Sequence, residues 1–102
     1  MCQFEVPQLF VEGVPIIAVS PKYPANVRGC VVLRYRLIEK PDADGRALVA
    51  NEIAPLYVDD GIPIELVESA QQALGKWLFT SRSHPEYSAA EFYAVFRFPR
   101  EE

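Results

Sequence analysis

The strongest constraint on the fold is a run of alternating apolar and polar side chains at residues 29–38. Its apolar members, spaced two residues apart, are Val31, Leu33, Tyr35 and Leu37. Because successive side chains of a strand point to opposite faces, this period of two predicts a strand with one buried face, and Arg34 and Arg36 point to water. The polar stretch EKPDADGR follows, and Gly45 within it predicts a hairpin turn into a second strand at residues 47–54.

A second periodic segment has the spacing of an amphipathic helix. Its apolar stripe consists of Leu66, Val67, Ala70, Ala73, Leu74, Trp77 and Leu78. Pro63 suits the first helical turn, and Asp59 and Asp60 place negative charge near the positive end of the helix dipole, where a capping role is expected. Small alanines within the stripe allow the helix to approach a sheet closely.

Residues 91–98 alternate again and predict a final strand. One face is expected to carry Phe92, Ala94, Phe96 and Phe98, and the other Tyr93, Val95 and Arg97. Residues 14–19 favour a short edge strand, limited on one side by Pro15. The order hairpin, helix, strand predicts an α+β fold: a three-stranded antiparallel sheet with one long helix packed on one face.

Length and charge narrow the class of protein. At 102 residues the chain is long enough for one domain, which we place at residues 14–102, after an extended N-terminal segment at residues 1–13. Lys and Arg number 10 against 14 Asp and Glu, and the basic residues do not cluster, which argues against nucleic-acid binding. No apolar run approaches the ~20 residues of a membrane-spanning helix, so we expect any membrane attachment to come from an anchor outside this chain.

Signals for catalysis, metals and cofactors are weak. The adjacent side chains of Asp59 and Asp60 diverge rather than share a proton, and His84, in a polar loop, is expected at the surface. Cys2 and Cys30 lack the spacing of metal ligands. We therefore expect no enzymatic activity, no metal and no cofactor. The residues alone do not decide whether Cys2 and Cys30 form a disulfide in an oxidising compartment. They also do not decide whether Cys2 is the lipid-bearing residue of a lipoprotein.

Binding features are better represented. The final strand is aromatic and free of Pro and Gly, so nothing within it blocks the pairing of an added strand. Two interpretations stay open from the residues alone: the strand is an exposed docking edge, or its aromatics are core and a neighbour covers the edge.

The order of the motifs resembles the C-terminal domain of TonB, the energy transducer of Gram-negative bacteria. The resemblance covers about Val14 to Phe98 and rests on several landmarks together. These are Pro21-x-Tyr23-Pro24, then Gly29-x-Val31-x-Leu33-x-Tyr35-x-Leu37, then Asp44-Gly45-Arg46, then a helix ending Lys76-Trp77-Leu78-Phe79, then an aromatic strand ending near Phe96.

The resemblance implies a periplasmic domain of the cell envelope that binds extended peptides of outer-membrane transporters by strand addition and so couples to energised transport. It places the docking strand at about Phe92 to Phe98, with the Pro-x-Tyr-Pro segment alongside. The partner-binding residues that it implies are Ser20, Pro21, Tyr23, Pro24, Phe92, Tyr93, Val95 and Arg97. The alternative is a stand-alone scaffold domain of the same fold, which self-associates, for example as a homodimer, through an open sheet edge.

Overall fold

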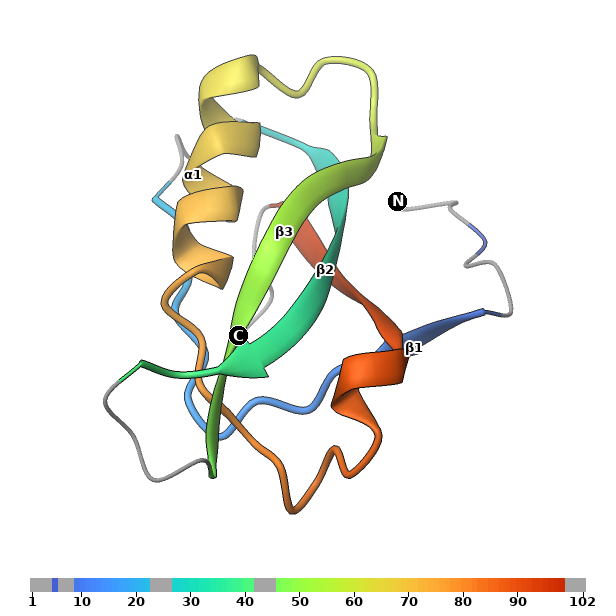
Figure 1. The fold of residues 1–102 in the computed structure, drawn as a ribbon. Coiled ribbons are helices and arrows are strands. Elements are labelled where there is room, and N and C mark those ends of the chain that lie inside the picture. The colour runs from blue at the N-terminus through green and yellow to red at the C-terminus, as the bar shows by residue number, and fades with distance from the viewer. Residues whose placement is uncertain (1–4, 6–8, 23–26, 42–45, 99–102) are drawn as a thin grey trace.

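The fold is a curled sheet with one helix on its concave face (Figure 1). The structure is a computed structural model that describes Glu5 and residues 9–22, 27–41 and 46–98. Within those ranges five strands form one sheet in the order β1-β5-β2-β3-β4. The strands are β1 (Phe10–Glu12), β2 (Gly29–Glu39), β3 (Ala47–Val58), β4 (Phe79–Thr80) and β5 (Glu91–Phe98). The helical elements are α1 (Ile64–Leu74) and a 3-10 turn, η1 (Tyr87–Ala89).

The predicted three-stranded sheet is wrong, because two short strands extend it to five. The three predicted strands are present as β2, β3 and β5, but β1 adds to β5 in parallel and β4 adds to β3 antiparallel. These added strands have three and two residues, too few to show a period of two. They belong to the sheet because they pair with β5 and β3, and their own side-chain pattern does not predict this. The predicted strand at residues 14–19 is likewise absent from that segment, which makes only an isolated bridge between Ile17 and Leu78.

The sheet curls because β3 is longer than the strand it faces. Between the pairs Val31–Val58 and Glu39–Leu48, nine residues of β2 face eleven of β3. The two extra residues fall at register shifts, and such bulges bend a strand and increase its twist. Glu52 lies at one of them with a left-handed φ of 52°. The bent sheet wraps around α1 (Figure 1).

The core lies between α1 and the concave face of the sheet. The predicted faces are confirmed: α1 buries Leu66, Val67, Ala70, Ala73 and Leu74, and the sheet buries Val31, Leu33, Tyr35, Leu37, Phe92, Ala94, Phe96 and Phe98. The helix ends at Leu74, earlier than its apolar stripe. Trp77 therefore leaves the helix and packs its ring against Phe79 and Phe96.

Residues 13–22, here called the strap, connect β1 to the side of α1. The strap crosses the lower part of the view in Figure 1 and then rises beside the helix. The main-chain N–H of Ile16 donates to Leu78 O at 2.8 Å, and Leu78 N–H donates to Ile17 O at 2.9 Å. Further along, Trp77 Nε1 donates to Val19 O at 2.8 Å, and Ser69 Oγ donates to Lys22 O at 3.1 Å. The strap is thus fixed to the segment that follows α1 and to α1 itself.

Gly13, the first residue of the strap, passes directly over the Tyr35 hydroxyl. A Cβ atom at Gly13 would lie 2.1 Å from Tyr35 Oη and 3.0 Å from a ring carbon of Phe79. Tyr35 is 1% exposed, and its hydroxyl approaches the main chain of Gly13 without reaching hydrogen-bond geometry. Burial, and then the charge of Glu12, raise the pKa of Tyr35 above its ordinary value.

Asp59 joins the start of β2 to the end of β3. Its Oδ2 accepts the Cys30 N–H at 2.8 Å, its own N–H donates to Cys30 O at 3.0 Å, and its Oδ1 accepts the Tyr57 hydroxyl. The predicted helix-capping role of Asp59 is therefore wrong: Pro63 occupies the N-cap of α1, without a side-chain cap. Cys30 is fully buried and takes part in a disulfide bond. Cys2, the partner considered from the sequence, lies outside the described residues.

The first prediction concerns the Asp59 carboxylate. The Tyr57 hydroxyl and then the Cys30 N–H hold the pKa of Asp59 below its ordinary value. A lowered folded-state pKa stabilises the fold above the pKa of the unfolded chain, and that contribution disappears as the pH falls through the folded-state pKa. We expect Asp59→Asn to lower the urea midpoint at pH 7. The difference in midpoint from the original chain should become smaller as the pH falls below about 4. Asp60→Asn, at the exposed neighbouring position, is the control, and an equal loss at pH 7 and pH 3 would contradict the argument.

The second prediction concerns the crowding of Gly13 and Tyr35. Gly13→Ala should lower the free energy of unfolding by about 2 kcal/mol, because an added methyl group overpacks a filled site. Tyr35→Phe removes a buried hydroxyl without a partner and should leave stability unchanged or raise it by about 1 kcal/mol. The double variant should lose less than the sum of the single variants, with a coupling of about 1 kcal/mol by urea unfolding. Strict additivity would show that the two residues do not compete for this space.

Candidate docking edge

Strand β5 is paired along nearly its whole length on one side and along only part of it on the other. Its inner edge pairs with β2 from Phe92 to Phe98. Its outer edge pairs with β1 only at Glu91–Tyr93. Beyond that point the chain of β1 turns away at Gly13 to pass over Tyr35. No strand within the described ranges lies along the outer edge from Ala94 onward.

The pairing of β2 fixes which main-chain groups of β5 face inward. Cys30 exchanges both of its main-chain hydrogen-bonding groups with Asp59, on the β3 side. Successive residues of a strand direct their N–H and C=O groups to alternate sides, so Val31 directs its groups toward β5. Its partner there is Phe96, and the register stays regular from Gly29–Phe98 onward. The N–H and C=O groups of Phe96 therefore face β2.

By the same alternation, Val95 and Arg97 direct their main-chain groups away from β2. These two residues lie beyond the last pair of β1 and β5, which is Glu12–Tyr93. Their side chains lie on the convex face, where Val95 is half-buried and Arg97 is exposed. Two N–H and two C=O groups thus face outward along this part of β5.

The other predicted partner-binding residues have different surroundings. Phe92 is 2% exposed, and its side chain belongs to the core. Tyr93 faces Glu12 of β1. Ser20 and Pro21 lie in the strap, between residues bonded to Trp77 and to Ser69 of α1. Tyr23 and Pro24 lie outside the described residues.

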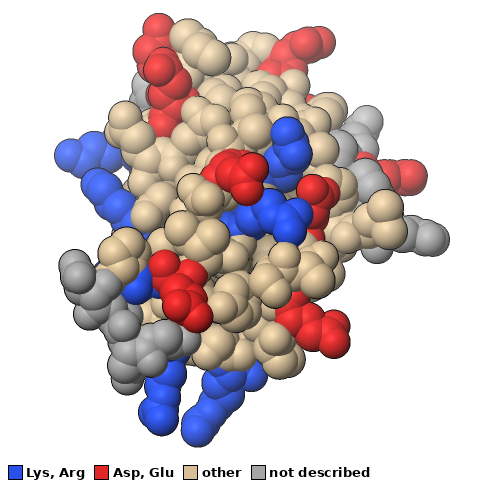
Figure 2. Space-filling model, in the orientation of Figure 1, with Lys and Arg blue, Asp and Glu red and all other residues tan. Residues whose placement is uncertain are grey.

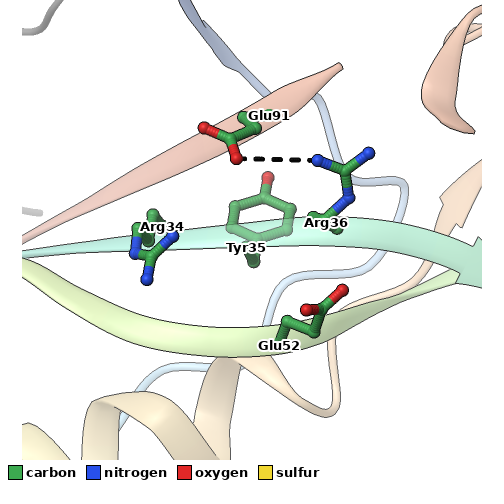
Figure 3. A pocket seen from close by; sticks show the side chains of 5 residues that line it. All are labelled: Arg34, Tyr35, Arg36, Glu52 and Glu91. Carbon is green, nitrogen blue, oxygen red and sulfur yellow. Dashed lines mark ion pairs between the residues drawn. The ribbon is translucent and has the colours of Figure 1, made fainter. Parts of the chain in front are cut away.

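A hollow on the convex face lies next to the same strands (Figure 3). It has a volume of about 350 Å³ and is lined by Arg34, Tyr35, Arg36, Glu52 and Glu91. Arg36 Nη1 lies 3.6 Å from Glu91 Oε1, and Arg36 Nη2 donates to Ser88 O at 2.9 Å. The bulge brings Glu52 to the rim, at a cost of about 1 kcal/mol for a left-handed non-glycine residue.

Charge on this hollow is balanced, with two guanidinium groups and two carboxylates. The face drawn in Figure 2 likewise shows acidic and basic side chains interspersed rather than gathered in one patch. Within the described ranges no group of three His, Cys, Asp or Glu side chains is placed to hold a metal ion. No helix there is long and apolar enough to span a bilayer.

His84 is the residue that sequence reasoning most clearly misplaced. The prediction that it lies at the surface is wrong, since it is 7% exposed. Its ring meets Phe79 and Phe92 edge to face, with centroid distances of 5.6 and 5.5 Å. Its nitrogens join two distant segments: Nε2 accepts the Val14 N–H at 3.1 Å, and Nδ1 lies 3.1 Å from Thr80 O. No local pattern signals this burial, because the flanking residues are polar and the contacts come from remote parts of the chain.

The third prediction tests the orientation of the β5 main chain by amide hydrogen exchange. The amides of Ala94 and Phe96, which face β2, should be strongly protected. The amides of Val95 and Arg97, which face outward, should exchange at least tenfold faster than those of their neighbours. Equal protection along residues 94–97 would show that another part of the chain already pairs with this edge.

Comparison with known proteins assigns neither family nor function. Searches against protein-family models, curated sequences and solved structures find no match to the chain.

Proposed function

We propose that this domain is a protein-binding module that takes up an extended peptide as an added strand on the outer edge of β5. The observation that carries the proposal is the outward direction of the main-chain groups of Val95 and Arg97 beyond the end of β1. An edge with unpaired N–H and C=O groups is a template for another strand. The binding function is non-enzymatic.

The existing pair of β1 and β5 supports the geometry of such an addition. Three residues of β1 already lie parallel to β5 on this edge. A peptide that continues the same line past Glu12 would meet Val95 and then Arg97, about 3.3 Å per residue along the strand. On the convex face it would place side chains beside these two residues. An apolar residue beside Val95 and an acidic residue beside Arg97 would form favourable cross-strand pairs.

The resemblance to the TonB C-terminal domain supports a more specific partner. We propose that the peptide belongs to an outer-membrane transporter and that the domain acts in the periplasm, coupled to energised transport. What supports this step is the order of the quoted motifs, together with a hairpin, a helix and a final strand in that order, β2, β3, α1 and β5. In that family the added strand lies beside the final strand, which corresponds here to β5.

Self-association is the second candidate function. It is favoured by exposed apolar side chains in and around β1 and along the strap: Leu9, Val11, Val14, Ile16 and Ile17, each at least half exposed. A second copy covering this row would bury apolar surface that a monomer leaves in water. Sedimentation that depends on concentration, without peptide binding, would favour this function over the first.

The fourth prediction tests peptide addition by NMR titration. The probes are synthetic peptides that copy the extended N-terminal segments of outer-membrane transporters. A binding peptide should shift and protect the amides of Val95 and Arg97. Val95→Pro removes an outward N–H without breaking a bond to β2 and should weaken binding at least tenfold, equivalent to about 1.4 kcal/mol.

Two controls separate main-chain pairing from other effects. Arg34→Gln changes an exposed side chain of the hollow on β2 and should leave the affinity unchanged. Peptides N-methylated at single positions leave the protein intact, and methylation should abolish binding at every second residue, because alternate N–H groups face β5. Unchanged amides across the whole peptide panel, or loss of binding at consecutive methylated positions, would contradict strand addition.

A further inference from the structure

We propose that the hollow on the convex face binds a small zwitterion, a molecule that carries one carboxylate and one ammonium group, such as a free amino acid. The hollow lies over β2 and its two neighbours rather than at the outer edge of β5, so this inference is independent of the proposed function. Figure 3 shows Arg34 and Arg36 on either side of Tyr35 along β2, with Glu91 and Glu52 flanking that strand from β5 and β3.

Arg36 is held in position by two neighbours. Its Nη1 lies 3.6 Å from Glu91 Oε1, and its Nη2 donates to Ser88 O at 2.9 Å. A guanidinium group has five N–H donors in a planar fork, so these two contacts leave donors for a ligand. The side chains of Arg36 and Glu91 are 36% and 43% exposed, which leaves the pair within reach of a molecule in the hollow.

Arg34 and Glu52 have no such partner. Within the described ranges, no ion pair or hydrogen bond joins the Arg34 guanidinium or the Glu52 carboxylate to another group. Both side chains are exposed, and both line the same hollow from adjacent strands. Besides the Arg36–Glu91 pair, the hollow therefore offers one unpaired cation and one unpaired anion to a ligand.

The main chain places Glu52 at the hollow in an unfavourable conformation. At the register shift between Arg34 and Arg36, two residues of β3 face one residue of β2, and Glu52 is one of the two. Its φ of 52° lies in the left-handed region, which glycine or asparagine adopts more readily than glutamate. Residues held in such sparsely populated regions cluster at binding and catalytic sites. A carboxylate at this position thus points to a ligand.

The balance of charge favours a ligand that carries both signs. A phosphate or another multiply charged anion near Arg34 and Arg36 would also meet the carboxylates of Glu52 and Glu91, and a divalent cation would meet the two guanidinium groups. A zwitterion avoids both conflicts. Its carboxylate can accept hydrogen bonds from Arg34 and Arg36, which lie two residues apart on one face of β2, and its ammonium group can donate to Glu52.

The size of the hollow agrees with a ligand of this class. Its volume of about 350 Å³ lies near the lower end of the range of about 300–1,000 Å³ for small-molecule pockets. Such a volume suits a molecule of amino-acid size rather than a nucleotide. Because the charged groups stay partly in water, we expect a dissociation constant on the order of 1 mM.

The test is an NMR titration of the intact protein with glycine, 4-aminobutyrate and 6-aminohexanoate, which differ in the spacing of their two charges. At least one of them should shift the amides of Arg34, Arg36 and Glu52 until the shifts saturate. Acetate and methylammonium, which carry one charge each, should bind at least tenfold more weakly. Added salt should weaken binding of the zwitterion, because it screens partly exposed charges.

Two variants remove the unpaired charges one at a time. Arg34→Gln and Glu52→Asn should each weaken binding of the zwitterion at least tenfold. Because asparagine adopts the left-handed conformation more readily than glutamate, Glu52→Asn should keep or raise the urea midpoint while it loses the ligand. The matched controls Arg82→Gln and Glu68→Gln remove the same charges at exposed positions outside the hollow and should leave binding unchanged.

The outcomes separate a zwitterion site from general attraction of ions. The absence of saturable shifts with all three zwitterions would overturn the proposal, whether or not the variants fold. Equal affinity for acetate or methylammonium, or unchanged affinity in both Arg34→Gln and Glu52→Asn, would overturn it as well. Saturable binding that both variants weaken would support it even if no peptide adds at Val95 and Arg97, since that result would count against the proposed function alone.

Discussion

The pairing of β2 on both of its edges is the constraint on which the rest of the structure depends. β2 lies in the middle of the sheet, between β3 and β5, and Val31, Val32 and Leu33 have no exposed surface. Where β2 is hydrogen-bonded on both sides, unpaired main-chain N–H and C=O groups can occur only on the strands to either side of it. β4 then covers part of β3, and β1 covers part of β5. The outward-facing stretch at Val95 and Arg97 is what remains of that edge beyond β1.

Sequence reasoning succeeded where a segment has a regular period and one buried face. The alternation of β2 and β5 and the apolar stripe of α1 identified the residues that form the core. It was incomplete for β3, which continues to Val58 through Pro55, because its two bulges interrupt the alternation. It missed β1 and β4, because a segment of only two or three residues joins a sheet according to the partner strand that is available. Burial of His84 has the same origin, since Val14 and the aromatic rings around it come from distant segments.

The candidate docking edge could likewise be predicted only in part. The phase of the final strand follows from its pattern, so the convex-face positions of Tyr93, Val95 and Arg97 could be assigned in advance. The neighbour of the strand could not be assigned in advance, because a pattern of side chains carries no information about which segment pairs with a main-chain edge. From the sequence the edge could be open or covered by a neighbour; in the structure β1 pairs with it as far as Tyr93, and the core contains Phe92.

The short pairing of β1 reconciles two opposing requirements on this edge. A long open edge exposes a sheet to uncontrolled pairing with other chains, so some cover is favourable. A cover tethered to the same chain competes with a peptide at a high effective concentration, on the order of millimolar for a short flexible link. Complete cover would therefore exclude weak peptides altogether. If a peptide adds to this edge as proposed, it pairs with Val95 and Arg97, because β1 stops at Glu12.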